Sequence, residues 1–303
     1  MPTDVPVTVV GGFLGAGKTT LVNRLIPAID RRVGVLVNDF GELAIDQRLI
    51  VAADDDVVAL SNGCICCAMR DGVMSTVYQV LEREDPPEHL VVEASGVSDP
   101  RSLADLFIDA ERVGTVRLDA LIGVADAGRF DPTDRLARAQ VQAADLVVLN
   151  KIDTVDEERR AEVEAAVREA APHARVVPAS YGNVPVPILL GARADQMRKL
   201  GHVHGIDASR FESWSYVRDE PVSFRHILPV LKDLPPSIYR VKGTLNLEER
   251  PNKDIVVQVV GRRLWVKTVG DTDAPRTALA FIAERDTVDR EALDARLSGS
   301  GHP

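Results

Sequence analysis

The sequence predicts a doubly wound α/β domain with a mostly parallel sheet, followed by a smaller carboxy-terminal α+β domain. From residue 5 to about residue 190, short Val/Leu/Ile runs alternate with longer amphipathic stretches, the order of elements in an α/β fold. The short runs are continuously apolar, as in strands that are buried on both faces of a parallel sheet. After about residue 210 the chain changes to strands that follow one another closely. At 303 residues the chain is long enough for both domains.

We expect the first domain to span residues 1–200. Its expected strands are Val5–Val10, Val33–Asn38, Val57–Leu60, Leu90–Ala94, Leu118–Ala125, Leu146–Asn150 and Val176–Pro178. Its expected helices are Lys18–Ile29, Gly72–Glu84, Pro100–Ala110, Pro132–Ala144, Asp156–Ala171 and Pro187–Leu200.

Residues 201–211 are predicted to be a linker because they are polar and contain Gly and His, and residues 212–303 to be the second domain. The expected strands of this domain are Glu212–Val217, Tyr239–Leu247, Ile255–Gly261, Leu264–Val269 and Thr277–Ala283, and its helices are Ser223–Leu234 and one that Asp289 caps and that ends at Leu297. Pro235 and Pro236 stop the first of these helices, and Gly261-Arg262 predicts a tight hairpin. Antiparallel strands with two helices make this domain α+β.

The charge and the cysteine content of the chain indicate which binding partners are excluded and which cell compartment is expected. The formal net charge of −10 argues against nucleic acid or an anionic membrane surface as a partner. No apolar run approaches the length that spans a membrane, and the first residues lack the pattern of a signal peptide. Three clustered cysteines without a secretory signal favour a reducing compartment, so we expect a cytoplasmic protein.

The motif GFLGAGKT at residues 12–19 lies between an expected strand and an expected helix. This is the setting of a phosphate-binding loop, in which glycines let backbone N–H groups surround a phosphate at a helix amino terminus. Lys18 is expected to reach the β- and γ-phosphate oxygens, and Thr19 to bind Mg²⁺. The residues expected to surround the nucleotide phosphates are Gly12, Gly15, Ala16, Gly17, Lys18, Thr19 and Thr20.

A second motif, Glu93-Ala94-Ser95-Gly96, follows an apolar strand. Glu93 is placed to hold the Mg²⁺ shell, and the Gly96 N–H to detect a γ-phosphate. We therefore expect Lys18, Thr19 and Glu93 to form the catalytic set.

The third motif is Asn150-Lys151-Ile152-Asp153, the pattern of guanine recognition. The Asp153 carboxylate can accept hydrogen bonds from guanine N1–H and the exocyclic amine, two donors that adenine does not present together. Asn150 is expected to bond the purine edge, and Lys151 to pack over the ring. Ser180 follows the next strand and is a further candidate for contact with the base.

All three cysteines of the chain, Cys64, Cys66 and Cys67, lie in the motif SNGCICC at residues 61–67. Three thiolates suit a soft or borderline ion, first Zn²⁺ and otherwise Co²⁺ or Ni²⁺, and they leave one coordination position for a further ligand or a client protein. The alternatives are a redox pair of Cys64 and Cys67, or thiols buried for structural reasons. His202 and His204 can capture a metal or be solvated linker residues.

Together, these motifs make the chain resemble the CobW-type metallochaperone GTPases, P-loop proteins related to the nickel insertases of urease and hydrogenase maturation. The resemblance is carried by GGFLGAGKTT at residues 11–20, NDFGE at 38–42, SNGCICC at 61–67, the Glu93 motif with Asp99-Pro100, and NKID at 150–153. Arg240-Val241-Lys242-Gly243 and Leu279–Ala283 are similar to the family's carboxy-terminal domain.

The resemblance implies slow hydrolysis of Mg²⁺–GTP to GDP and phosphate, and binding of a transition metal at the three cysteines. It also places Asp39 and Glu42 in a switch segment that approaches the γ-phosphate or the metal. The chain departs from the family at Asp39, where Glu is usual, and at Ser95, where Thr is common. The long histidine tract of many members is also reduced here to His202 and His204.

The sequence thus predicts a GTP-driven metal insertase that delivers Zn²⁺, Co²⁺ or Ni²⁺ to a client metalloprotein, and a dimer that depends on nucleotide or metal is compatible with this role. Two other functions remain open at this point: a P-loop kinase of a small molecule, which predicts a preference for ATP, and a non-enzymatic zinc buffer.

Overall fold

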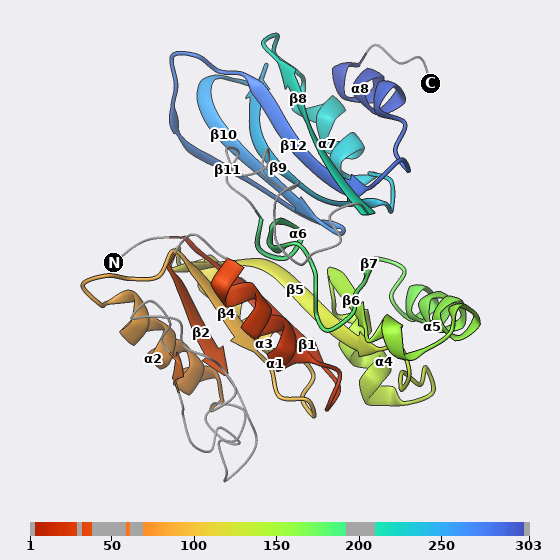
Figure 1. Ribbon diagram of the computed structural model, residues 1–303. Helices are drawn as coiled ribbons and strands as arrows, with labels where there is room; N and C mark the ends of the chain where they lie inside the picture. Colours follow the sequence, from red (N-terminus) through yellow and green to blue (C-terminus); the bar gives the residue numbers. More distant parts are fainter. Residues whose placement is uncertain (1–3, 29–31, 38–58, 61–68, 192–209, 300–303) are drawn as a thin grey trace. The chain divides into compact units, whose positions relative to one another are not determined.

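The computed structural model describes residues 4–28, 32–37, 59–60, 69–191 and 210–299 (Figure 1). The chain divides into two compact units, Met1–Val186 and Pro187–Pro303. Each unit has its own sheet.

The first unit is built on a seven-stranded sheet in the order β3-β2-β4-β1-β5-β6-β7, in which every adjacent pair is parallel. Its strands are β1 (Val5–Gly12), β2 (Val33–Val37), β3 (Ala59–Leu60), β4 (His89–Glu93), β5 (Val116–Asp126), β6 (Leu146–Asn150) and β7 (Arg175–Pro178). Every residue of β2, β4, β5, β6 and β7 is buried, which explains why these strands are continuously apolar or nearly so. The predicted doubly wound α/β class is confirmed.

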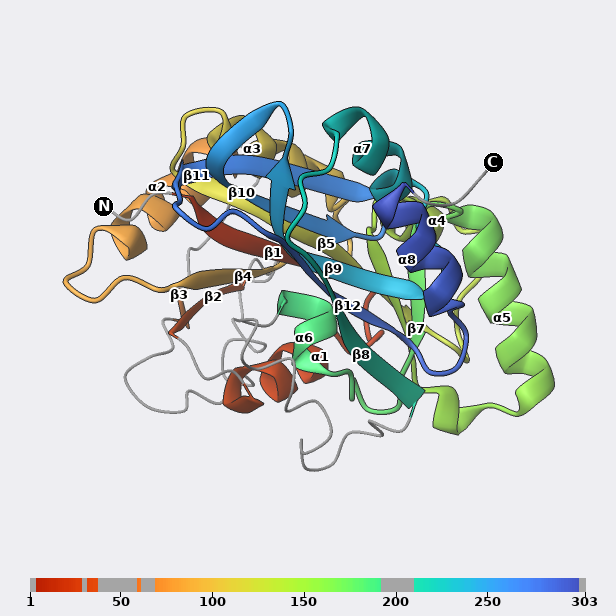
Figure 2. The same ribbon diagram turned by 90° about the horizontal axis from the view of Figure 1, so that it is seen from above.

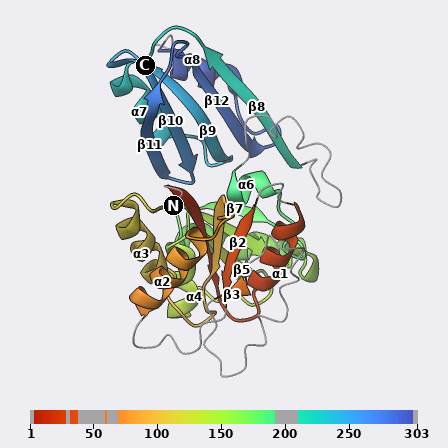
Figure 3. The ribbon, with the colours of Figure 1, turned by 90° about the vertical axis from the view of Figure 1, so that its left-hand side faces the viewer.

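Helices cover both faces of this sheet, with α1 on one side and α2 and α3 on the other (Figure 3). Their bounds are α1 (Lys18–Leu25, continued by the 3₁₀ turn Ile26–Ala28), α2 (Met69–Leu81), α3 (Arg101–Glu111), α4 (Arg135–Gln142), the 3₁₀ turn Ile152–Thr154 and α5 (Glu157–Ala170). The packing against the sheet is apolar: Val77 of α2 and Phe107 of α3 are fully buried in one cluster with β1 and β4. A second cluster joins α4 and α5 to β5, β6 and β7.

The topology brings five loops to one edge of the sheet. Because all the strands are parallel, the loops that follow β1, β4, β5, β6 and β7 leave from the same end. In the register, Val10 lies opposite Glu93 and Asp126 lies opposite Asn150. The three predicted nucleotide motifs therefore converge although they are separated by up to 140 residues in the sequence.

The second unit is an antiparallel five-stranded sheet, in the order β11-β10-β9-β12-β8, with two helices on one face (Figures 1 and 2). Its elements are α6 (Val186–Leu190), β8 (Phe211–Arg218), α7 (Phe224–Lys232), β9 (Ile238–Leu247), β10 (Arg250–Val260), β11 (Arg263–Asp271), β12 (Thr277–Glu284) and α8 (Arg290–Ser298). One apolar cluster, which includes Ile227, Val241, Phe281 and Leu297, joins α7 and α8 to the sheet. The predicted α+β class of the carboxy-terminal part is confirmed.

One predicted helix is too long. The expected helix Pro187–Leu200 ends at Leu190, because Gly191 adopts the left-handed conformation with φ of 69°. Most of the predicted linker, residues 201–209, lies outside the described residues. Within the described part of the chain, no helix combines the length and the apolar character needed to span a bilayer.

Candidate functional site

The phosphate-binding loop joins β1 to α1 and is shaped by Gly17. This residue has φ of 103°, and a Cβ built on it would lie 2.3 Å from Nδ2 of Asn150. A side chain at position 17 therefore meets both backbone strain and a steric clash. Gly17 offers no side-chain cap to the first turn of α1, and an uncapped helix start of this kind is suited to binding an anion.

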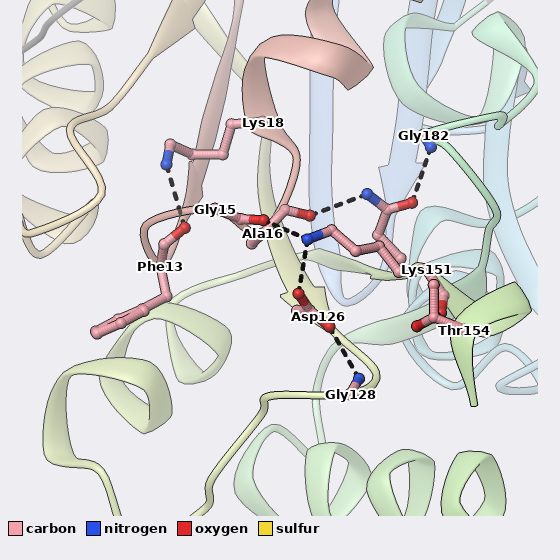
Figure 4. Close-up of polar contacts among 10 residues, drawn as sticks. Phe13, Gly15, Ala16, Lys18, Asp126, Gly128, Lys151, Thr154 and Gly182 are labelled. Atoms are coloured by element: carbon pink, nitrogen blue, oxygen red, sulfur yellow. Dashed lines mark hydrogen bonds and ion pairs between the residues drawn. The ribbon is translucent and has the colours of Figure 1, made fainter. Parts of the chain in front are cut away.

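Lys18 and Thr19 are the first two residues of α1, and each contacts another part of the predicted site. The Lys18 ammonium group donates to the carbonyl oxygen of Phe13 at 3.3 Å, so it folds back over its own loop (Figure 4). The Thr19 hydroxyl donates to Oε1 of Glu93 at 2.9 Å. Glu93 ends β4 and is only 4% exposed. A hydroxyl oxygen and a carboxylate at this distance are ligands of the kind that Mg²⁺ prefers, so the donor set fits the predicted ion.

The turn after β4 is closed by its own hydrogen bonds. The Ser98 N–H and hydroxyl both donate to the carbonyl oxygen of Ser95, at 3.2 and 2.9 Å. The buried Gly96 lies within this turn, beside the phosphate-binding loop: a Cβ built on it would lie 3.0 Å from Cα of Leu14. The turn therefore places Gly96 beside the predicted phosphate-binding loop.

Asp99 and Arg101 form an ion pair between this turn and α3. Arg101 donates to Asp99 from its side chain, at 2.8 and 3.0 Å, and from its backbone N–H at 3.0 Å. Burial by itself raises the pKa of Asp99, but these bonds outweigh it, and the pKa lies below its ordinary value of 3.8. Asp99 thus stays ionised and fixes the start of α3.

Asn150 is buried, and its amide links two loops. Its Nδ2 donates to the carbonyl oxygen of Ala16 at 2.9 Å, and its Oδ1 accepts from the Gly182 N–H at 2.8 Å (Figure 4). The sequence assigned this side chain to the purine edge. The structure gives it a framework role as well, since it ties the phosphate-binding loop to the loop that follows β7.

The next two polar residues of the motif differ from each other: Lys151 is bonded to other parts of the protein, whereas Asp153 is exposed. The Lys151 ammonium group donates to the Gly15 carbonyl oxygen at 2.7 Å and to Oδ2 of Asp126 at 2.8 Å (Figure 4). Its backbone is left-handed, with φ of 60°, and starts a 3₁₀ turn in which Asp153 is exposed. The Asp153 carboxylate accepts no hydrogen bond from any residue within the described ranges, so it is available to a ligand.

A cavity of about 260 Å³ lies between the phosphate-binding loop, the end of β5 and α4. Its wall is mainly apolar, formed by Phe13, Leu14, Val124, Phe130, Ala137 and Val141. Asp126 and Asp131 also line it. Hydrogen bonds from the Thr133 hydroxyl and N–H lower the pKa of Asp131, so this carboxylate is ionised at neutral pH.

Several predicted site residues cannot be placed. Cys64, Cys66, Cys67, Asp39, Glu42, His202 and His204 lie outside the described residues. Among the residues that the structure does describe, no three His, Cys, Asp or Glu side chains are grouped so that they could hold a metal. Ser180 is described: it is half-buried and follows β7, and its carbonyl oxygen accepts from the Asn183 N–H at 3.0 Å.

Sequence reasoning missed Asp126, Gln140 and Gly182. Asp126 ends an apolar strand in the same way as Glu93, and this signal was available in the sequence. Gln140 and Gly182 stand in ordinary helical and loop contexts, and only the fold reveals their contacts.

Comparisons with known proteins support the sequence-based expectation. The family model described as the CobW/HypB/UreG nucleotide-binding domain matches residues 6–178, and the cobalamin synthesis protein cobW C-terminal domain matches residues 211–300. A protein of Sinorhizobium sp named zinc chaperone CobW is 30% identical, over 97% of this chain and 96% of that one. The zinc-regulated GTPase metalloprotein activator 1 of Dictyostelium discoideum is 30% identical, over 64% of this chain and 50% of that one. The solved structure of the Zn(II)-bound YjiA GTPase from E. coli is 20% identical, covers 99% of this chain and 100% of that one, and gives a TM-score of 0.48.

Proposed function

Because this chain belongs to the CobW/HypB/UreG family of nucleotide-binding proteins, we propose that it is a GTPase that couples its nucleotide state to the binding and delivery of a transition metal. Zn²⁺ is the favoured cargo, since the Sinorhizobium relative is named a zinc chaperone. The recipient is a client metalloprotein, and the cytoplasm is the compartment in which the cysteines stay reduced.

The observation that carries the nucleotide half of this proposal is the convergence of three motifs at one sheet edge. Lys18 and the N–H groups at the start of α1 would bind the β- and γ-phosphates, while Thr19 and Glu93 would hold Mg²⁺, which neutralises the developing charge on the phosphates. The exposed Asp153 would accept from guanine and reject adenine. The rival function of a small-molecule kinase predicts a preference for ATP, so Asp153 argues against it.

The metal half of the proposal rests on the sequence and on the family. Cys64, Cys66 and Cys67 would bind the cargo ion, with Asp39 and Glu42 in the preceding switch segment. Three sulfurs leave one position open, which suits a site that must release its ion to a client.

The coupling that such a device needs is moderate. A hundredfold difference in metal affinity between the GTP and GDP states corresponds to about 2.8 kcal/mol, within the usual range for allosteric proteins. Reciprocity then requires bound metal to tighten GTP by the same factor.

The test is a competition titration of Zn²⁺ and of Co²⁺ against a chelator, in the presence of Mg²⁺ with a non-hydrolysable GTP analogue, Mg²⁺ with GDP, or no nucleotide. We expect the tightest metal binding with the GTP analogue, and loss of this binding in Cys66→Ser. Lys18→Ala should retain the basal metal affinity but lose its dependence on nucleotide. Equal metal affinity in all three nucleotide states would contradict the coupling and favour the zinc-buffer alternative.

A further inference from the structure

The side chain of Gln140, on α4, reaches across to the turn that follows β4. Its Nε2 donates to the carbonyl oxygens of Gly96 and Ser98, each at 3.1 Å. Because both partners are acceptors, the amide must present its NH₂ group to the turn. Gln140 is only 1% exposed, so water does not replace these bonds. One side chain therefore holds the turn at two points.

The phosphate-binding loop packs against the same turn. A Cβ built on Gly96 would lie 2.7 Å from Cδ2 of Leu14 and 3.0 Å from its Cα. Gly96 therefore contacts Leu14 of the phosphate-binding loop while its carbonyl oxygen is bonded to Gln140. Displacement of the turn in either direction would break the hydrogen bonds or create a clash.

The backbone N–H of Gly96 indicates what the fixed position of this turn is for. Gly96 is buried, and its N–H donates to no acceptor within the described part of the chain. Backbone N–H groups of buried residues are nearly always paired, and among the described residues none accepts from this one, so it can donate to a ligand. A γ-phosphate beside the phosphate-binding loop is such a ligand.

We propose that Gln140 is a positioning residue that fixes the turn so that the Gly96 N–H can bond the γ-phosphate. The inference rests on the proposed GTPase function and adds to it a residue that supports the discrimination of GTP from GDP through the Gly96 N–H. Because only GTP carries a γ-phosphate, loss of the Gln140 bonds should weaken GTP binding and leave GDP binding intact.

The test is the Gln140→Met variant, which keeps the length of the buried side chain and removes both donors. We expect the affinity for a non-hydrolysable GTP analogue to fall about tenfold or more, because a loosened turn no longer offers the Gly96 N–H at a fixed place. The affinity for GDP should change by less than about twofold, and kcat for GTP hydrolysis should fall. Gln142→Met is the matched control, since Gln142 lies on the same helix with its side chain exposed, and it should bind both nucleotides like the wild type.

Two outcomes would overturn the inference. One is a Gln140→Met protein that binds both nucleotides like the wild type. The other is an equal loss of affinity for the GTP analogue and GDP with a lower Tm, which would show that Gln140 only supports the fold. A wild-type chain that binds neither nucleotide contradicts the proposed function itself, and this inference with it.

Discussion

Neighbouring residues of the NKID motif have separate physical roles. Asn150 is buried and bonded at both ends of its amide, to Ala16 and to Gly182, so it belongs to the framework. Asp153, three residues later, is exposed and bonds no residue of the described chain. A motif that sequence reasoning treats as one recognition unit therefore divides into a residue that is bonded within the framework and a residue that is exposed, which we propose to contact the base.

This division predicts different effects for two substitutions. Asn150→Ala should lower the free energy of unfolding of the first unit by about 2–4 kcal/mol even without nucleotide, because the Ala16 carbonyl and the Gly182 N–H lose their partner. Asp153→Ala should leave that free energy unchanged and reduce the preference for GTP over ATP by about tenfold or more. Calorimetry of the nucleotide-free proteins and competition binding measure the two effects. The division is wrong if Asn150→Ala is as stable as the wild type.

The sequence indicates the residues that we propose to contact the nucleotide, but not the residues that support them. Lys18, Thr19 and Glu93 stand in motifs whose spacing follows from phosphate and metal chemistry, and the structure brings Thr19 and Glu93 together. Gln140 has no such signature, because its role depends on a carbonyl group 44 residues earlier in the chain. Contacts of this kind are set by the topology of the sheet, which only the fold shows.

At the scale of elements, the buried strands were predictable and their polar ends were not. Strand β6 has the predicted bounds, Leu146–Asn150, since it is apolar throughout and ends in a recognisable motif. Strand β10 begins at Arg250, five residues before the predicted Ile255. Its first residues are polar or exposed, and pairing with β9 and β11, with a register shift after Asp254, holds them in the sheet. Backbone pairing of this type leaves no hydrophobic pattern in the sequence.

The start of helix α7 is held by a carboxylate, so the stability of this element should depend on pH. Its first residue, Phe224, has a backbone N–H that donates to the Glu249 carboxylate at 2.9 and 3.0 Å, and the Ser223 hydroxyl donates at 2.8 Å. These bonds lower the pKa of Glu249 below its ordinary value of 4.5. The carboxylate therefore contributes stability above about pH 4.5, and this contribution is lost as the pH falls through the lowered pKa in the folded state.

We expect Glu249→Gln to be less stable than the wild type at pH 7, and the difference to shrink steadily below pH 4.5. Urea unfolding followed by tryptophan fluorescence measures it in the second unit alone, because both tryptophans of the chain, Trp214 and Trp265, lie there. Glu248→Gln is the control, since the Glu248 side chain is exposed and accepts no hydrogen bond from the described residues. A stability difference that stays constant from pH 7 to pH 3 would contradict the capping role.

At the scale of the whole molecule, the question is where the first unit ends. The sequence predicts a boundary near residue 200, because the pattern after Pro187 is typical of one more helix of the α/β domain. The structure instead groups Pro187 and the residues after it with the second unit. The physical link is Arg240 of β9, a buried guanidinium that donates to the carbonyl oxygens of Ile188 at 3.5 Å and Leu189 at 3.2 Å on α6.

This link predicts that a fragment of residues 187–303 is more stable than one of residues 201–303. The shorter fragment lacks the α6 carbonyl groups, and a hydrogen bond from a charged donor contributes about 1.5–3 kcal/mol. Urea unfolding of both fragments, followed by tryptophan fluorescence, should show a difference of about this size. In Arg240→Met versions of both fragments the difference should nearly disappear, because the side chain that reaches α6 is gone. Equal stability of the two unsubstituted fragments would instead mean that α6 does not stabilise the second unit. The stability data would then not favour a boundary at residue 187 over the predicted one near residue 200.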